Sequence, residues 1–134
     1  LTRMLLGRPY TINSTVIKGS GRGRKLGFPT MNLSPVPEKI LPKFGVYVVF
    51  SSGKDFCLPG LGYIGTRPTF VSSHQPVVEI YVDGEVGVRY GETVRVAFCR
   101  FLREDRAFSS EKELKQQMKK DFMEMKKYVH SQSR

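Results

Sequence analysis

The segment TVRVAFCRFL (93–102) has the pattern that decides the fold class. Apolar residues occupy every second position from Val94 to Phe98, and polar or small residues lie between them. Successive side chains of a β-strand point to opposite faces, so this period of two is typical of a half-buried strand. The segment is therefore predicted to be a strand with one face in the core.

Four further runs are rich in β-forming residues and are bounded by Gly, Pro or Asp: 11–17, 45–50, 58–64 and 77–82. Together with 93–102 they predict an antiparallel barrel or sandwich. In the run 77–82, Val78, Ile80 and Val82 share one face. Glu79 and Tyr81 therefore lie on the other face, which places a carboxylate on a stiff element among apolar neighbours.

The pattern changes after residue 108, where a helix is predicted. Ser110 and Glu113 have the spacing of a capping box, in which the hydroxyl and the carboxylate each satisfy a free backbone N–H group. Apolar residues then follow at steps of three or four: Leu114, Met118, Phe122, Met125 and Val129. This stripe predicts that the helix packs on one opening or flank of the barrel.

Length and composition limit the classes of protein to consider. The chain has 134 residues, 40% of them hydrophobic, which is enough for one domain with its own core. Two cysteines, Cys57 and Cys99, cannot build a disulfide framework and favour a reducing, cytoplasmic setting. No apolar run approaches the roughly 20 residues that a membrane helix needs, so we expect no membrane partner.

Positive charge is concentrated near the start of the chain. The formal net charge is +10, and the first 37 residues contain six basic residues and no acidic one. A glycine-rich segment holds several of these charges: Gly19, Gly21, Arg22, Gly23, Arg24, Lys25 and Gly27. Such a segment fits two alternatives equally well. One is a loop that binds phosphate through backbone N–H groups, and the other is an ordinary basic surface loop. The spacings of the known phosphate-binding motifs are absent.

Thr30 and Asn32 follow this loop and lie two positions apart, directly after Pro29. On an extended segment their side chains point the same way. A hydroxyl and an amide oxygen are hard ligands that suit Mg²⁺ together with the phosphates of a nucleotide. The same two residues are also typical of a turn in which they bond to nearby backbone.

The order of motifs resembles that of the riboflavin kinase family over nearly the whole chain. The similar segments are GRGRKLGFPTMN (21–32), GVY (45–47), IGTRPTF (64–70), VEIY (78–81), YG (90–91) and LREDRAF (102–108). The resemblance implies a compact six-stranded β-barrel with a long C-terminal helix. It also implies the transfer of the γ-phosphoryl group of ATP to the 5′-hydroxyl of riboflavin, giving FMN and ADP.

The resemblance assigns roles to individual residues. Thr30 and Asn32 would bind Mg²⁺ and the nucleotide phosphates, and the loop from Gly19 to Gly27 would form a mobile flap over the nucleotide. Glu79 would accept the proton of the attacking hydroxyl. The flavin would lie near Arg103, Asp105 and Phe108. The sequence departs from the family pattern in four places: Met31 replaces Ala, Asp105 replaces Glu, Arg89 precedes the Tyr-Gly pair, and the loop 83–87 differs from the usual form.

The resemblance also predicts the organisation of the protein. Residues 1–10 resemble the junction that follows a nucleotidyltransferase in bifunctional riboflavin kinase/FAD synthetases, and residues 11–134 resemble the kinase domain. We therefore expect a covalent N-terminal FAD synthetase domain and no nucleic-acid partner. The two alternatives are a nucleic-acid-binding β-barrel and a noncatalytic flavin- or nucleotide-binding module.

Overall fold

The computed structural model describes residues 10–18, 29–68 and 74–132. Its six strands are β1 (Tyr10–Ile17), β2 (Thr30–Leu33), β3 (Gly45–Ser52), β4 (Cys57–Pro68), β5 (His74–Val82) and β6 (Thr93–Arg103). A single 3₁₀ turn, η1 (Glu38–Ile40), precedes β3, and one long helix, α3 (Glu111–Gln132), follows β6. All five strands expected from the sequence are confirmed, and the sixth, β2, contains the Thr30–Asn32 pair.

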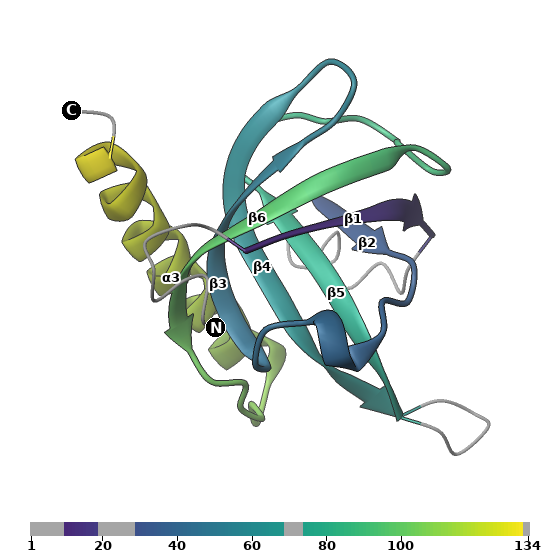
Figure 1. Cartoon of the computed structure of the whole chain (residues 1–134). Helices are drawn as coiled ribbons and strands as arrows, with labels where there is room; N and C mark the ends of the chain where they lie inside the picture. Colours follow the sequence, from purple (N-terminus) through teal and green to yellow (C-terminus); the bar gives the residue numbers. More distant parts are fainter. Residues whose placement is uncertain (1–9, 19–28, 69–73, 133–134) are drawn as a thin grey trace.

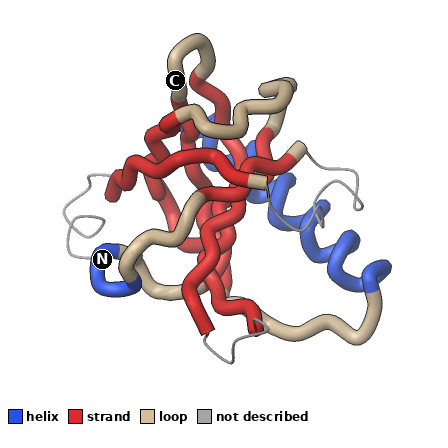
Figure 2. The backbone as a smooth tube through the Cα atoms, turned by 90° about the vertical axis from the view of Figure 1, so that its right-hand side faces the viewer, coloured by secondary structure: helices blue, strands red, loops and turns tan. Residues whose placement is uncertain are grey.

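The strands form a closed antiparallel barrel in the order β1-β2-β5-β4-β3-β6, with α3 along its outside (Figure 1). The six-stranded barrel with a C-terminal helix is therefore confirmed, and the sandwich alternative is wrong. Figure 2 shows the helix as a separate element beside the strands.

Side chains fill the interior of the barrel. The largest of them are almost fully buried and include Tyr47, Phe98, Met31, Ile64 and Ile80. The Tyr47 ring meets the Phe98 ring edge to face, with centroids 5.3 Å apart. Its hydroxyl donates a hydrogen bond to the carbonyl oxygen of Lys43 (2.6 Å), and burial raises the pKa of Tyr47 to about 12.

Helix α3 packs on the flank of the barrel. Met118 and Met125 bury their side chains against outward-facing residues of β3, β4 and β5, namely Val46, Val48, Leu61 and Tyr81. Because the helix covers this face, β3 is buried on both sides from Gly45 to Val49. The predicted apolar stripe therefore forms the contact.

At the start of α3, only one of the two hydrogen bonds of the predicted capping box is present. The backbone N–H of Glu113 donates to Ser110 Oγ (3.2 Å), as expected for an N-cap. The reciprocal half was predicted wrongly, because the Glu113 carboxylate accepts a hydrogen bond from the Ser109 hydroxyl. A neighbouring hydroxyl has taken the place of the backbone N–H of Ser110.

The pairing of β6 with β3 has two irregularities, which change the direction of the side chains that follow them on β6. The register pairs Val49 with Phe98 and Val48 with Arg100, then Tyr47 with Phe101 and Val46 with Arg103, so β6 carries two extra residues. Such bulges change which face a side chain occupies. The first turns Arg100 outward and Phe101 inward, and the second turns Arg103 outward, toward α3.

Candidate active site between the barrel and the C-terminal helix

The site begins with a row of side chains across three adjacent strands. Asn32 on β2 pairs with Glu79 on β5, and Glu79 pairs in turn with Tyr63 on β4. Directly paired residues of an antiparallel sheet point to the same face, with Cβ atoms about 4.5–5.5 Å apart. Here that face is the outer one, because the alternate residues Met31 and Ile80 belong to the core.

A second row lies beside the first. Thr30 pairs with Tyr81, and Tyr81 pairs with Leu61. Thr30 and Asn32 therefore flank the Glu79 strand on one side, and residues of β4 flank it on the other. This arrangement follows from the short strand β2, which brings the segment after the glycine-rich loop into the sheet.

Glu79 is a buried carboxylate with a defined partner. Its side chain is only 4% exposed, and its Oε1 atom accepts a hydrogen bond from the Tyr81 hydroxyl (2.8 Å). A buried charge is tolerated only when hydrogen bonds replace its hydration. Tyr81 therefore helps to hold Glu79 in place at the outer surface of the barrel.

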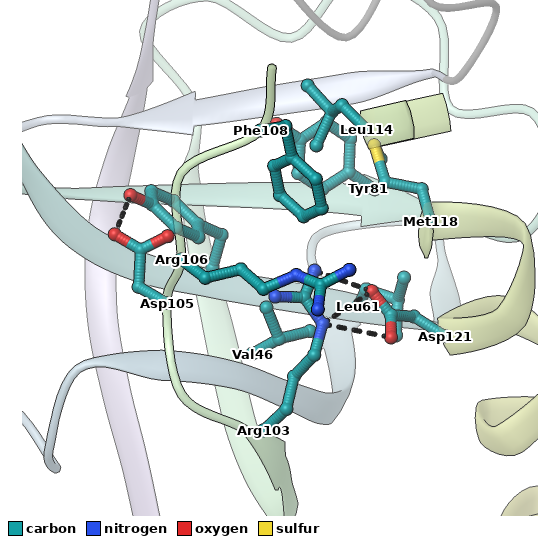
Figure 3. A pocket seen from close by; sticks show the side chains of 11 residues that line it. Val46, Leu61, Tyr81, Arg103, Asp105, Arg106, Phe108, Leu114, Met118 and Asp121 are labelled. Atoms are coloured by element: carbon teal, nitrogen blue, oxygen red, sulfur yellow. Dashed lines mark hydrogen bonds and ion pairs between the residues drawn. The ribbon is translucent and has the colours of Figure 1, made fainter. Parts of the chain in front are cut away.

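A cavity opens beside Tyr81, between the barrel and the first half of α3. Its volume, taken as the space open to the centre of a water molecule, is about 60 Å³, and the cavity is partly open to solvent. Its lining consists of Tyr63 and of ten residues labelled in Figure 3: Val46, Leu61, Tyr81, Arg103, Asp105, Arg106, Phe108, Leu114, Met118 and Asp121. Most of the lining is apolar or aromatic, and the polar groups are few and convergent, as is usual in sites for small organic ligands.

The charged groups of this cavity are balanced. Two arginines, Arg103 and Arg106, and two aspartates, Asp105 and Asp121, line it. Arg103 and Asp121 form an ion pair with Nη2 and Oδ2 2.8 Å apart, and the Tyr63 hydroxyl donates to Asp105 Oδ2 (2.8 Å). The formal charge of the lining is therefore zero, which suits an uncharged ring better than a triphosphate.

Comparisons with known proteins identify the family. The sequence model described as "Flavokinase: Riboflavin kinase" matches residues 6–129. The chain belongs to the riboflavin kinase family. It is 35% identical over 130 residues to the bifunctional riboflavin kinase/FMN adenylyltransferase of Bacillus subtilis, covering 96% of this chain and 41% of that protein. The protein of the same name from Escherichia coli is 36% identical over 122 residues, covering 90% of this chain and 38% of that protein.

Solved structures agree on the fold. A crystal structure named as a macrolide-efflux protein from Streptococcus pneumoniae matches with a TM-score of 0.81 and 30% identity, covering 92% of this chain and 40% of that chain. The riboflavin kinase of Trypanosoma brucei matches with a TM-score of 0.68 and 22% identity, covering 92% of this chain and 78% of that chain. The chain spans about two fifths of the length of the curated relatives described above.

The residues that the resemblance to riboflavin kinases singled out fall into three groups. Thr30, Asn32 and Glu79 are neighbours across β2 and β5. The cavity is lined by all three residues expected at the flavin: Arg103, Asp105 and Phe108. The residues expected at the nucleotide within the glycine-rich loop, from Gly19 to Gly27, lie outside the described residues.

Four polar residues that line the candidate site were not predicted from the sequence, namely Tyr63, Tyr81, Arg106 and Asp121. Asp121 carried a usable signal, because it lies three residues after Met118 and four before Met125, within the apolar stripe of the helix. An acid at such a position needs a buried cationic partner. Tyr63 had no local signal, since its place depends on the pairing of β4 with β5.

The described residues contain no helix long and apolar enough to cross a membrane. Among them there is also no group of three or more His, Cys, Asp and Glu side chains that could hold a metal ion.

Proposed function

We propose that this domain transfers the γ-phosphoryl group of ATP to the 5′-hydroxyl of riboflavin, giving FMN and ADP. One observation carries the proposal. The carboxylate of Glu79 lies between Asn32 on one neighbouring strand and Tyr63 on the other, and Tyr63 lines the cavity. A base in that position has the phosphate-binding candidates on one side and the flavin cavity on the other.

Glu79 is the proposed general base. Phosphoryl transfer needs little covalent help from the protein, but the attacking hydroxyl must be held and its proton accepted. The hydrogen bond from Tyr81 to Oε1 orients the Glu79 carboxylate, which we assign as the acceptor of the proton of the substrate hydroxyl.

Thr30 and Asn32 are the proposed ligands of Mg²⁺ and of the nucleotide phosphates. Their donor set fits that ion, because a hydroxyl and an amide oxygen on one face of β2 are hard ligands beside a carboxylate. Bound Mg²⁺ would supply charge neutralisation for the phosphates. The glycine-rich loop from Gly19 to Gly27 is proposed to cover the nucleotide and exclude water.

The flavin is proposed to occupy the cavity between β4, β6 and α3. Its lining offers aromatic and apolar faces from Tyr81, Phe108 and Met118. Arg103 and Asp105 supply polar groups for the edge of the ring. The zero formal charge of the lining favours binding of the uncharged ring in this cavity. The positive charge of the glycine-rich loop favours that loop as the part of the chain that binds the phosphates.

The decisive assay is formation of FMN from riboflavin and MgATP, with Glu79→Gln as the test of mechanism. This change keeps the size of the side chain but removes the base, so kcat should fall by about 10² to 10⁴. Glu38→Gln removes an exposed carboxylate from η1 and should leave kcat unchanged. An active Glu79→Gln variant would remove the assignment of the base. A chain that binds riboflavin without turnover would support the noncatalytic module.

We also propose that in its full-length protein this domain is joined to an FMN adenylyltransferase domain. The support is that two relatives named as bifunctional riboflavin kinase/FMN adenylyltransferases are longer proteins, of which this chain covers 41% and 38%. Sequencing the coding region upstream of residue 1 tests this directly.

A further inference from the structure

The Arg103–Asp121 pair is unusually well defined for a contact between a strand and a helix. Arg103 Nε lies 3.1 Å from both Asp121 carboxylate oxygens, and Nη2 lies 2.8 Å from Oδ2. Asp121 is only 4% exposed, and Gln117, one turn earlier on α3, donates a further hydrogen bond to its Oδ1 atom (3.0 Å). The carboxylate is therefore held from two directions.

This pair forms the wall of the cavity. Arg103 and Asp121 line the cavity on one side and a second, more open groove between β6 and α3 on the other. The bulge in β6 turns Arg103 outward at this point, and Figure 3 shows its guanidinium directed at the Asp121 carboxylate. The Arg103 guanidinium also lies 5.7 Å from the centre of the Phe108 ring.

The hydrogen-bond inventory of Arg103 leaves donors for a ligand. A guanidinium has five N–H groups. Two point at Asp121, and one donates to the carbonyl oxygen of Glu104 (3.3 Å), so two remain among the contacts made by the described residues. Because Asp121 neutralises the charge, these donors suit the neutral carbonyl edge of a ring more than a phosphate.

We propose that Asp121 is a positioning residue that holds Arg103 so that its remaining N–H groups meet the carbonyl edge of the flavin ring. This inference rests on the proposed function. An arginine side chain loses substantial rotamer freedom when it binds a ligand, and the fixed partner removes that loss before binding. Gln117 supports the same arrangement by orienting the Asp121 carboxylate.

The test is Asp121→Asn, which keeps the shape of the side chain but removes its charge. The KM for riboflavin should rise about 10- to 100-fold, the worth of one hydrogen bond to a charged group. Both kcat and the KM for MgATP should change by less than about threefold, because the nucleotide candidates lie on β2. The matched control is Glu124→Gln, which removes an exposed carboxylate one turn further along the same helix and should leave the KM for riboflavin unchanged.

A double variant separates positioning from a purely structural role. If Asp121 acts through Arg103, then adding Asp121→Asn to Arg103→Met should change the KM for riboflavin no further. Additive effects would overturn the proposal, as would an unchanged KM in a folded Asp121→Asn variant. If Asp121→Asn does not fold, Gln117→Met removes the hydrogen bond to Asp121 Oδ1 without leaving a charge unpaired. Gln117 Oε1 also accepts a hydrogen bond from Arg106 Nη2 (3.0 Å), so the effect of Gln117→Met on the KM for riboflavin is measured in an Arg106→Met background. A threefold or larger rise in KM supports positioning, and an unchanged value overturns it.

Failure of the proposed function would be seen separately, as an unmodified chain that forms no FMN. In that case the quenching of riboflavin fluorescence gives the dissociation constant for riboflavin. The same variants should then raise that constant about 10- to 100-fold. Equal constants in the unmodified chain and in Asp121→Asn would overturn the role of Asp121.

Discussion

Replacement of Tyr81 by Phe should destabilise the domain far more than replacement of Tyr63 by Phe. Both tyrosine hydroxyls donate to a carboxylate at 2.8 Å, Tyr81 to Glu79 and Tyr63 to Asp105. The first contact is buried, with Tyr81 7% and Glu79 4% exposed, whereas the second is at the surface. The two variants therefore remove the same chemical group from hydrogen bonds of the same length in different surroundings.

The magnitudes follow from this difference in burial. A buried hydrogen bond to a charged acceptor is worth about 1.5–3 kcal/mol, and loss of an exposed one costs roughly 0.5 kcal/mol or less. The unfolding entropy of a 134-residue domain is roughly 0.28 kcal/mol per degree. Tyr81→Phe should therefore lower Tm by about 5–11 °C, and Tyr63→Phe by about 2 °C or less.

Thermal unfolding followed by circular dichroism measures both shifts under one set of conditions. Equal shifts would refute the reasoning, because they would mean that burial does not determine the strength of this contact. A second check is the kinase assay, in which Tyr81→Phe should also lower kcat, since the proposed base loses the group that orients it.

Three further predictions concern the scaffold. Folding holds the pKa of Tyr47 at about 12, above its unfolded value, so the associated stability is complete below about pH 10 and is lost as the pH rises toward 12. Urea unfolding measures this at about pH 9 and pH 11.5. Between these two pH values, the free energy of unfolding of Tyr47→Phe should fall by roughly 1–2 kcal/mol less than that of the unmodified chain. Gly45→Ala should cost about 1–3 kcal/mol in the same assay, because its Cβ would lie 2.5 Å from the carbonyl oxygen of Arg103; a midpoint unchanged from that of the unmodified chain would count against this. Ser110→Ala should cost about 1 kcal/mol by removing the N-cap of α3, whereas Ser131→Ala near the end of that helix should cost less.

The sequence predicted those parts of the fold that depend on local periodicity. Alternation from Val94 to Phe98 correctly gave the inward face of β6. Beyond Phe98 the alternation stops being informative, because the bulges depend on how β6 pairs with β3. The apolar steps after Ser110 likewise gave α3, since a helix is specified by neighbours three and four residues apart.

The candidate site was predictable only in part, for the same reason. The sequence placed Glu79 on the face of its strand opposite to Val78 and Ile80, and the structure shows that this is the outer face of the barrel. Its placement beside Asn32 and Tyr63 did not, because those pairings join segments 47 and 16 residues away along the chain. Strand β2 has four residues, too few for periodicity to indicate a register.

The position of the site outside the barrel has a simple physical cause. A small closed barrel has an interior just wide enough for its own side chains, and here Tyr47, Phe98 and Met31 fill that space. A ligand must therefore bind on the outer face, where a convex sheet offers no concavity by itself. Helix α3 supplies the second wall of the cavity through Met118 and Asp121. The helix is thus part of the candidate site, and changes on its barrel-facing stripe should alter the proposed binding of flavin as well as stability.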